Sequence, residues 1–429
     1  MSENRYDYLI LGNSTAAVAA VEALRRVDSC GTLAVVSGEP QAAYCAPLIT
    51  YVLAGKVPEE QLSYRPADFY ERLRVATHLG QPAVEIRPAQ HQVVLADGTV
   101  LGYGKLLLAV GGTPIRPNLP GMGLKGVFTL TRYEDMCQIR DYLRLRNVRE
   151  AVVIGGGMIG VKSAEALNDL GVHTTIVELQ DRVLSLALDS QGSAMARGAL
   201  ERAGLRVLTG SSATAIAPSG EYASGVRLDS GMLLPAQIVI VAVGVRPNVS
   251  LATGAGLAVN RGVLVDDHCR TSDPEIYAAG DVVEVYDALL GESRPVAIWP
   301  NAFLQGQVAG TNMAGGEAAY DGSVPMNSIQ VCKLPTISVG LTDPAAADEV
   351  LQHTSPDGLD YRCILLRGGR ILGAVFVGDI ERAGIITGLL REGIDVSDFK
   401  QKLIGRELGL LALPKEYRKH KVMGPGIEV

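Results

Sequence analysis

The chain has 429 residues and lacks the features of several large protein classes. Lys and Arg number 39 against 46 Asp and Glu, and the resulting net charge of −7 gives no basic footprint for nucleic acid. No uninterrupted apolar run reaches about 18 residues, the length that a transmembrane helix needs. The N-terminus has no basic stretch followed by an apolar one, so we expect no signal peptide and a cytoplasmic protein.

Closely spaced metal-binding or redox residues are also missing. No two cysteines form a C-x-x-C or C-x-x-x-x-C pair, which removes the simplest iron–sulfur, zinc and local disulfide sites. The six histidines are scattered too, so we predict no metal site. Scattered thiols are typical of a reducing cytoplasm. The cysteines are Cys30, Cys45, Cys137, Cys269, Cys332 and Cys363.

Aromatic residues make up only 5% of the chain, whereas glycine is abundant at 49 residues. Many glycines with few aromatics suit an α/β protein whose backbone approaches a cofactor closely. A single hydrophobic core stops growing near about 250–300 residues, so a chain of this length predicts two or three domains.

Two stretches of the sequence show the order strand, turn, helix, strand. The first, residues 6–26, reads "YDYLILGNSTAAVAAVEALRR" and predicts a short apolar strand at 8–11 and a helix to about residue 26, before the strand "TLAVVSGEP". The second, residues 150–171, reads "EAVVIGGGMIGVKSAEALNDLG" and precedes the strand "HTTIVEL". We interpret them as two copies of one nucleotide-binding unit.

The second turn carries a complete dinucleotide-binding pattern. Gly155, Gly157 and Gly160 form G-x-G-x-x-G between a strand and a helix, where they allow a tight turn, a close pyrophosphate and helix–strand packing. Glu178, at the end of the next strand, would accept hydrogen bonds from an adenosine ribose and repel a 2′-phosphate. This favours NAD(H) over NADP(H), although Arg182 would serve a 2′-phosphate if Glu178 turned away.

The first turn is a degenerate version of the same pattern. In "GNSTAA" the three positions are held by Gly12, Ser14 and Ala17, which are small enough for close approach. The following strand ends in Ser37 where an acid is usual, and Glu39 stands two residues later. Either side chain would reach a ribose, so both remain candidates.

These elements, in this order, resemble the pyridine nucleotide–disulfide oxidoreductase family of flavoproteins. Three further segments carry the likeness: "LLLAVGGTPIRPNLPG" and "VIVAVGVRPN" resemble the family's connections between its FAD and NAD domains, and "TSDPEIYAAGDVVEV" resembles its second FAD fingerprint. In that fingerprint a strand, then Ala279, Gly280 and Asp281, precede a helix. The resemblance implies that Asp281 bonds the ribitol or pyrophosphate region of FAD.

The resemblance implies an α/β fold with two Rossmann-like domains. FAD would lie on residues 1–116 and 246–325, and NAD(H) on residues 117–245. From about residue 326 the pattern changes to short strands and then helices, which predicts an α+β interface or dimerisation domain over residues 326–429. We expect the basic and then Gly/Pro-rich tail at 414–429 to be frayed.

The implied cofactor contacts follow from the same alignment of motifs. Trp299, the single tryptophan, would either cover the flavin or fill a domain junction. For FAD the residues are Gly12, Ser14, Ala17, Glu39, Pro47, Gly111, Gly280, Asp281 and Trp299. For NAD(H) they are Gly155, Gly157, Met158, Ile159, Gly160, Glu178 and Gly244.

Within the family, the chain is most similar to the NADH-dependent branch of rubredoxin reductases and the flavin part of nitrite reductases. The residues are "YCAPLITYVLAG", "GVKSAEAL", "WPNAFLQGQVAGTNMAGG" and "ILGAVFVGDIERAG". In that branch FAD takes a hydride from NADH and passes electrons singly to an iron protein. The implied partner is therefore a small electron-transfer protein, rubredoxin or ferredoxin, or another redox subunit, and a homodimer is possible.

Two departures from the family concern charge and thiols near the flavin. Many relatives pair a Lys and a Glu there, at positions that match Thr50 and Lys162 in this chain. We expect Lys162 in the first turn of a helix, against the positive end of the dipole, so it either has a role near the flavin and nicotinamide or extends into solvent.

Cys45 raises the question of thiol chemistry. Coenzyme A-disulfide reductases and NADH oxidases or peroxidases of the family use one cysteine in this region. The segment "CAPLITY" instead resembles the electron-transfer branch, and a reactive thiol needs a lowered pKa. We favour packing near the flavin, and keep a Cys45-dependent enzyme and a non-catalytic flavin-binding subunit as alternatives.

Overall fold

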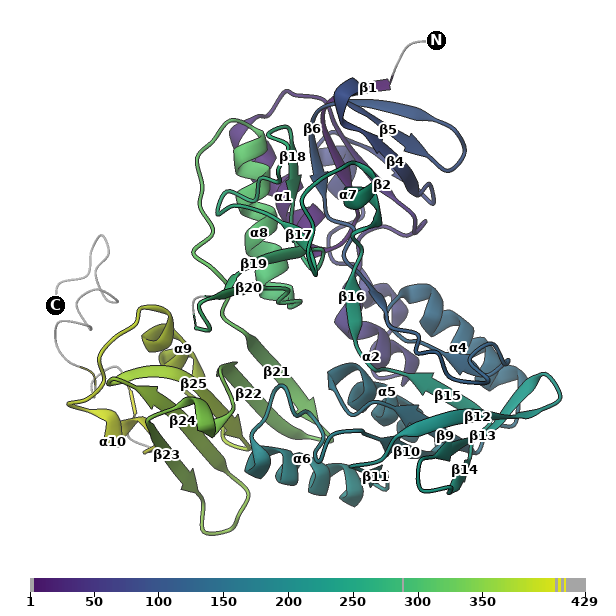
Figure 1. The fold of residues 1–429 in the computed structure, drawn as a ribbon, viewed down its shortest axis with the longest axis vertical. Coiled ribbons are helices and arrows are strands. Elements are labelled where there is room, and N and C mark those ends of the chain that lie inside the picture. The colour runs from purple at the N-terminus through teal and green to yellow at the C-terminus, as the bar shows by residue number, and fades with distance from the viewer. Residues whose placement is uncertain (1–3, 288, 406–407, 410–412, 414–429) are drawn as a thin grey trace. The chain divides into compact units, whose positions relative to one another are not determined.

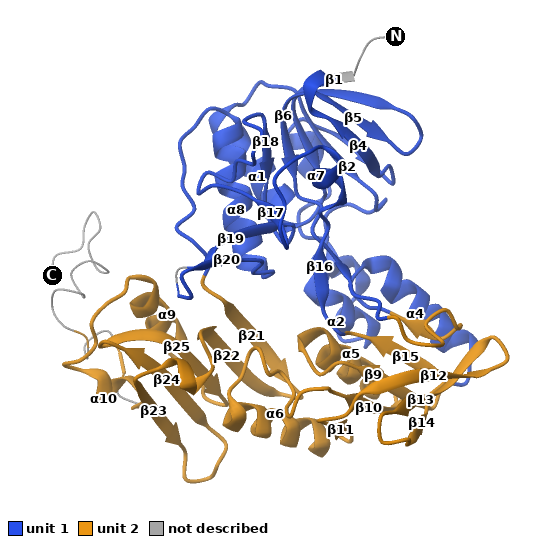
Figure 2. Cartoon of the chain, in the orientation of Figure 1, with its two compact units in different colours: residues 1–117, 129–147, 243–323 blue, residues 118–128, 148–242, 324–429 orange. Residues whose placement is uncertain are grey.

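The computed structural model describes residues 4–287, 289–405, 408–409 and 413 (Figure 1). The predicted frayed tail at 414–429 lies outside the described residues. The chain forms two compact units, each built from three separate stretches of sequence (Figure 2). The first unit comprises residues 1–117, 129–147 and 243–323, and the second comprises residues 118–128, 148–242 and 324–429.

The first unit is built on a seven-stranded sheet in the order β3-β2-β1-β6-β5-β4, with β18 also paired to β6. Strands β1, β2, β3, β6 and β18 run parallel, and β4 and β5 add antiparallel partners. Leu9, Ile10 and Leu11 are almost completely buried, as expected for a strand covered on both faces. The bounds are β1 (Asn4–Leu11), β2 (Leu33–Ser37), β3 (Val75–Leu79), β4 (Ala83–Arg87), β5 (Gln92–Leu95), β6 (Val100–Leu108) and β18 (Ile276–Ala278).

Helices α1 (Thr15–Val27) and α8 (Trp299–Met313) pack side by side in this unit (Figure 1). Glycines four residues apart on α8 face the backbone of α1. A Cβ added at Gly306 would lie 2.2 Å from the carbonyl oxygen of Ala16, and one at Gly310 would lie 2.3 Å from that of Ala20. The two helices can therefore approach this closely only with glycine at both positions.

The segment after Asp281 contains a strand before the helix that the second FAD fingerprint predicts. Residues 283–287 form the strand β19, and the helix α8 begins at Trp299. The physical reason is the β-branched run of Val282, Val283 and Val285, all buried, which favours an extended backbone. Strand β19 (Val283–Asp287) pairs with β17 (Val263–Leu264) and β20 (Glu292–Arg294).

Shorter elements complete the first unit. Strands β7 (Gly112–Pro114) and β16 (Val245–Pro247) pair antiparallel, so the two connections predicted from the sequence lie side by side. The helical elements are η1 (Ala46–Leu48), α2 (Ile49–Leu53), η2 (Glu59–Leu62), α3 (Phe69–Arg72), η3 (Pro88–Gln90), α4 (Tyr133–Leu145) and α7 (Ser250–Gly254).

The second unit contains a five-stranded parallel sheet in the order β11-β10-β9-β15-β8. Helix α5 (Met158–Asp169) connects β9 to β10, and α6 (Ser190–Arg202) precedes β11. An antiparallel meander of β12 (Ala213–Ser219), β13 (Tyr222–Leu228) and β14 (Leu233–Pro235) lies between β11 and β15 in the chain. The sheet strands are β8 (Val127–Phe128), β9 (Glu150–Ile154), β10 (His173–Val177), β11 (Arg206–Leu208) and β15 (Ile238–Val241).

The C-terminal part of the second unit is an antiparallel sheet in the order β21-β22-β25-β24-β23, followed by two helices. The parallel sheets and this α+β part confirm the predicted fold class. The bounds are β21 (Met326–Val331), β22 (Leu334–Gly340), η4 (Pro344–Ala346), β23 (Glu349–Thr354), β24 (Tyr361–Arg367), β25 (Arg370–Val377), α9 (Ala383–Arg391) and α10 (Lys400–Leu403).

None of the helices in the described part of the chain combines the length and the apolar character needed to cross a membrane.

Candidate functional site

The turn between β1 and α1, the first cradle, packs closely against the backbone of Ala109. Gly12 has a φ of +118°, and a Cβ added there would lie 2.0 Å from the carbonyl oxygen of Ala109, so only glycine fits. Ser14 is the exposed N-cap residue of α1, and Ala17 is buried. The first amide N–H groups of a helix have no partner within it, so this turn offers donors to an anionic group.

Asp281 is a shielded carboxylate close to the end of β18. Burial raises the pKa of the Asp281 carboxyl, and within the described residues this side chain has no hydrogen-bond or ion-pair partner. The preceding Gly280 has a φ of +85°, and its N–H donates to Oε1 of Gln305 at 2.8 Å. A shielded acceptor without a partner suits a ligand hydroxyl or amide. The residues of this unit therefore fit the expected FAD.

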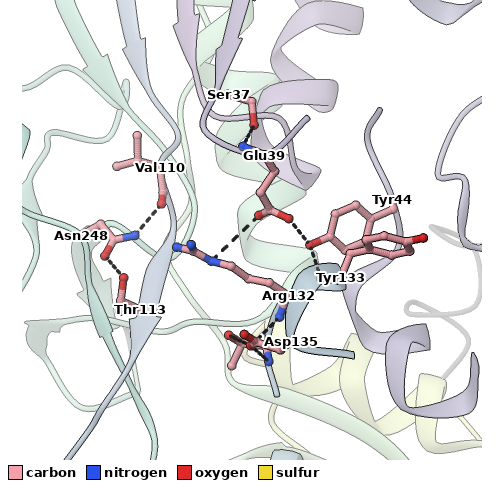
Figure 3. A network of polar contacts seen from close by, with 10 residues as sticks. Ser37, Glu39, Tyr44, Val110, Thr113, Arg132, Tyr133, Asp135 and Asn248 are labelled. Atoms are coloured by element: carbon pink, nitrogen blue, oxygen red, sulfur yellow. Dashed lines mark hydrogen bonds and ion pairs between the residues drawn. The ribbon is translucent and has the colours of Figure 1, made fainter. Parts of the chain in front are cut away.

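Glu39 lies at the centre of a polar network (Figure 3). Its backbone N–H donates to Oγ of Ser37 at 3.1 Å, and its Oε2 accepts from the hydroxyl of Tyr44 at 2.7 Å. Nε of Arg132 lies 4.0 Å from Oε1 of Glu39. Burial and the Glu39 charge raise the pKa of Tyr44 above its usual range. The two sequence candidates for a ribose contact, Ser37 and Glu39, thus lie together.

Helix α4 contributes further residues to this network. The N–H of Tyr133 donates to the hydroxyl of Tyr44 at 3.1 Å (Figure 3), and the hydroxyl of Tyr133 donates to Glu59. Nη1 of Arg140 also donates to Glu59, at 2.6 Å. The start of α4 therefore contacts both ends of the segment 44–59, which contains Cys45.

Cys45 is the residue before η1 and is half-buried. Its N–H donates to the carbonyl of Leu62 at 2.8 Å, and Pro47 lies in the following turn. Burial raises the pKa of the Cys45 thiol, which is the opposite of the shift that a reactive thiolate needs. The hydroxyl of Thr50 is buried, and no described residue partners it.

Trp299 begins α8, and its ring meets the ring of Tyr64 edge-on, with centroids 5.0 Å apart. Both residues belong to the first unit. This contact gives Trp299 a packing partner, and whether the ring also covers a flavin remains a prediction.

The two connecting segments are held by one asparagine. Nδ2 of Asn248 donates to the carbonyl of Val110 at 2.8 Å, and its Oδ1 accepts from the hydroxyl of Thr113 at 2.5 Å (Figure 3). Gly111 and Gly244, one in each connection, have φ values of +64° and +111°. Both therefore adopt a backbone that favours glycine, and both belong to the first unit.

The turn between β9 and α5 is the counterpart of the first cradle. Gly155 has a φ of +111°, and a Cβ added at Gly160 would lie 2.0 Å from the carbonyl oxygen of Gly155. An added Cβ at Gly157 would meet nothing within 4 Å, which leaves the space before the helix open. Met158 and Ile159 begin α5, and Met158 is 38% exposed.

Glu178 follows β10 and points back to this turn. Its carboxylate accepts from the N–H of Gly156 at 2.5 Å and from that of Gln180 at 2.7 Å. Arg182 donates to Asp181 at 2.9 Å. The acidic residue therefore lies at the cradle, as the spacing predicted, while Arg182 has another carboxylate as partner.

Lys162 does not extend into solvent. Its side chain is 16% exposed, forms an ion pair with Glu165 on the same helix, and donates to the carbonyl of Gln330 at 3.0 Å. Gln330 is in β21 of the C-terminal sheet. The sequence could not indicate this contact, because the two residues are 168 positions apart.

Tyr44, Arg132 and Asn248 join the site without any signal in the sequence. Tyr44 stands next to Cys45, but nothing in the residue pattern shows that its hydroxyl reaches Glu39. Arg132 and Asn248 belong to distant segments that only the fold brings close. Among the described residues, no group of three or more His, Cys, Asp or Glu is arranged to hold a metal ion.

Comparison with known families gives two matches along the chain. The family model of pyridine nucleotide-disulphide oxidoreductases matches residues 6–306. The model of the rubredoxin NAD+ reductase C-terminal domain matches residues 325–394.

Individual proteins show the same relationship. The epsilon subunit of NADH-dependent phenylglyoxylate dehydrogenase from Aromatoleum evansii is 30% identical over 94% of this chain and 96% of its own length. The nitrite reductase (NAD(P)H) of Bacillus subtilis is 27% identical over 91% of this chain, which spans only 48% of that relative. The crystal structure of NADH:rubredoxin oxidoreductase from Clostridium acetobutylicum matches with a TM-score of 0.75 and 27% identity, over 91% of this chain and 96% of that one.

Proposed function

Because the chain belongs to the pyridine nucleotide-disulphide oxidoreductase family, we propose that it carries electrons between NADH and a small electron-transfer protein of the rubredoxin or ferredoxin type. It is an oxidoreductase that uses FAD and NAD(H). The relatives named for NADH and rubredoxin, and the C-terminal match to rubredoxin reductases, support this acceptor class.

The observation that carries the proposal is the pair of dinucleotide cradles, one in each unit. Both follow a buried parallel strand, and in each a glycine is pressed against a backbone carbonyl: Gly12 against Ala109, and Gly160 against Gly155. Such close approach leaves room for a phosphate at the helix N-terminus. Two such turns fit a protein that keeps one dinucleotide bound as a cofactor and exchanges a second dinucleotide with solution.

We assign FAD to the first unit. The β1–α1 turn would receive the pyrophosphate of FAD. Asp281 would accept a hydrogen bond from a ribitol hydroxyl, and Glu39 beside Ser37 would accept one from the adenosine ribose. Bound FAD supplies the ability to take two electrons at once and release them singly. Gly111, Pro47 and Trp299 are proposed to line the same site.

We assign NADH to the β9–α5 turn of the second unit. The open space at Gly157 would admit the pyrophosphate to the N-terminus of α5. Glu178, held by the N–H of Gly156, would accept from the adenosine ribose and disfavour a 2′-phosphate.

A second candidate role is suggested by one relative. The chain matches a subunit of NADH-dependent phenylglyoxylate dehydrogenase along almost its whole length, so its partner would then be another redox subunit of a larger complex. The thiol-dependent alternative is less well supported, because burial raises the pKa of Cys45.

The remaining assignments are proposals of the same standing. FAD would occupy residues 1–116 with 246–325, NADH residues 117–245, and residues 326–429 would form the interface of a homodimer. Scattered cysteines suit a cytoplasmic location.

An anaerobic titration with NADH, followed by addition of oxidised rubredoxin or a [2Fe–2S] ferredoxin, tests the function. We expect bleaching of the flavin by NADH and its return when the acceptor is added. A flavin that NADH leaves oxidised would overturn the proposal, and a flavin that reduces but is reoxidised by neither protein would favour the subunit role.

A further inference from the structure

Two neighbouring side chains of α5 contact the tip of the β21–β22 hairpin, and neither cofactor assignment explains them. Nζ of Lys162 pairs with Glu165 and donates to the carbonyl of Gln330 at 3.0 Å. Oε1 of Glu165 accepts from the N–H of Cys332 at 2.9 Å and lies 3.7 Å from its Sγ. The helix that opens at the second cradle is therefore tied to the C-terminal sheet.

The hairpin tip adopts a conformation that needs support. Cys332 and Lys333, the two residues between β21 and β22, have φ values of +45° and +72°. Two-residue hairpins with this backbone usually carry Asn-Gly or another glycine pair, because side chains disfavour it. A strained turn persists where its surroundings hold it, and the carboxylate of Glu165 holds the N–H of Cys332.

The charges of the pair also depend on each other. The side chain of Glu165 is 7% exposed and that of Lys162 is 16% exposed. A buried carboxylate without a cation is costly, and a lysine close to a helix N-terminus is unfavourable unless an anion compensates it. Glu165 and Lys162 compensate each other within α5, and the hairpin supplies a carbonyl acceptor for Lys162 and an N–H donor for Glu165.

Lys162 lies one helical turn after Met158, the first residue of α5. The Lys162 contact is thus made close to the end of the helix that offers its free N–H groups to a pyrophosphate, and Glu165 contacts the hairpin one turn further along α5. A small tilt of this end would move all of those donors together, because a helix behaves as a rigid rod over one turn.

We infer that Lys162 and Glu165 are positioning residues, which fix the N-terminal turn of α5 against the β21–β22 hairpin and so set the affinity for NADH. The inference rests on the proposed binding of NADH at the β9–α5 turn. It assigns Lys162 to the orientation of the nucleotide site rather than to direct contact with the flavin.

A second contact between the same two parts of the unit provides a control. Asp189, the N-cap residue of α6, accepts from the N–H of Gly192 at 2.9 Å and from the hydroxyl of Tyr361 in β24 at 2.5 Å. Tyr361→Phe removes a tie to the C-terminal sheet that does not involve α5. Comparison with this variant distinguishes a specific effect of the Lys162–Glu165 pair from a general loss of stability in the second unit.

The experiment is anaerobic stopped-flow reduction of the FAD-loaded protein over a range of NADH concentrations, which separates the Kd for NADH from the limiting rate. We expect Lys162→Met and Glu165→Gln to raise the Kd by about tenfold, within the range of coupled buried pairs, and to leave the limiting rate within about twofold. Lys162→Arg should keep the Kd near that of the wild type. Tyr361→Phe should lower Tm without changing the Kd.

The double variant Lys162→Met/Glu165→Gln buries no unpaired charge, so it tests the inference even if a single variant fails to fold. We expect its Kd to be raised as well. An unchanged Kd in the folded variants, a lower limiting rate at unchanged Kd, or an equal rise in Kd for Tyr361→Phe would each overturn the inference. A wild-type protein that does not bind NADH would instead overturn the proposed function.

Discussion

The carboxylate of Glu178 accepts a hydrogen bond from the N–H of Gly156, which joins the end of β10 to the glycine turn after β9. The acidic residue and the turn are 22 positions apart in the sequence, yet they form one surface. A second bond, from the N–H of Gln180, keeps the carboxylate in this orientation. The surface is suited to a ribose diol beside a pyrophosphate.

From this contact we predict a preference for NADH. The wild-type protein should reduce its flavin with a higher kcat/KM for NADH than for NADPH. Glu178→Ala should reduce the difference in activation free energy between the two nucleotides by about 1–3 kcal/mol, the value of a lost charged contact. Steady-state kinetics with a dye acceptor measure both. Glu201→Ala, which removes an exposed acid of α6, is the matched control. A wild-type preference for NADPH would show that Glu178 does not serve the ribose.

The second prediction concerns the close contact between Gly12 and the backbone carbonyl of Ala109. Gly12→Ala would place a Cβ 2.0 Å from the carbonyl of Ala109, at a φ that side chains rarely adopt. Overpacking of this kind costs about 1–3 kcal/mol, so we expect a lower Tm and a protein purified with less than about half of its FAD. Gly123→Ala, where the added carbon meets nothing within 4 Å, should stay yellow.

FAD content is measured from the visible absorbance of the flavin released on heating, divided by the protein concentration determined before heating. If Gly12→Ala retained full FAD with an unchanged Tm, the first cradle would not be where FAD binds.

The third prediction concerns the shielded carboxyl of Asp281. Burial raises its pKa, so the folded apoprotein binds this proton more tightly than the unfolded chain, and the ionised form costs stability at neutral pH. Asp281→Asn should therefore raise the Tm of the apoprotein at pH 7. The gain should shrink as the pH falls below the raised pKa, where the wild-type carboxyl is protonated too.

The same substitution should weaken FAD binding by about tenfold, because a charged acceptor is replaced by a neutral one. Calorimetry of the apoprotein and fluorescence titration with FAD give the two values. A variant that is less stable without FAD and binds it equally well would show that Asp281 has a structural role only.

The fourth prediction is that Cys45 is dispensable. Burial raises the pKa of its thiol, and its backbone N–H, bonded to Leu62, is unaffected by a change of side chain. Cys45→Ser should keep NADH-dependent reduction of a one-electron dye within about twofold of the wild type. Anaerobic titration of the wild type with NADH should consume only the electrons that one FAD accepts, and should produce no charge-transfer absorbance at long wavelength. Loss of turnover in the variant would favour the thiol-dependent enzyme.

Local patterns predicted much of the fold. The glycines at 155, 157 and 160 indicate a tight turn before a helix, because the backbone conformation and close packing needed there exclude other residues. The continuous apolar strand at 9–11 is recognisable for the same local reason, since both faces of its sheet are covered. The strand at 283–287 lies between the Asp281 turn and α8, and its buried β-branched valines account for the extended backbone.

The order of residues by itself determined the two nucleotide-binding units and the placement of Glu178, because each depends on neighbours within one βαβ repeat. It also determined the α+β end, because short strands followed by helices form a local pattern. Only the tertiary structure decided that Asp281 is shielded and has no partner in the described part of the chain, that Tyr44 bonds Glu39, and that Lys162 reaches Gln330. Burial and pairing between distant segments depend on which surfaces pack together, and the spacing of residues along the chain does not contain that information.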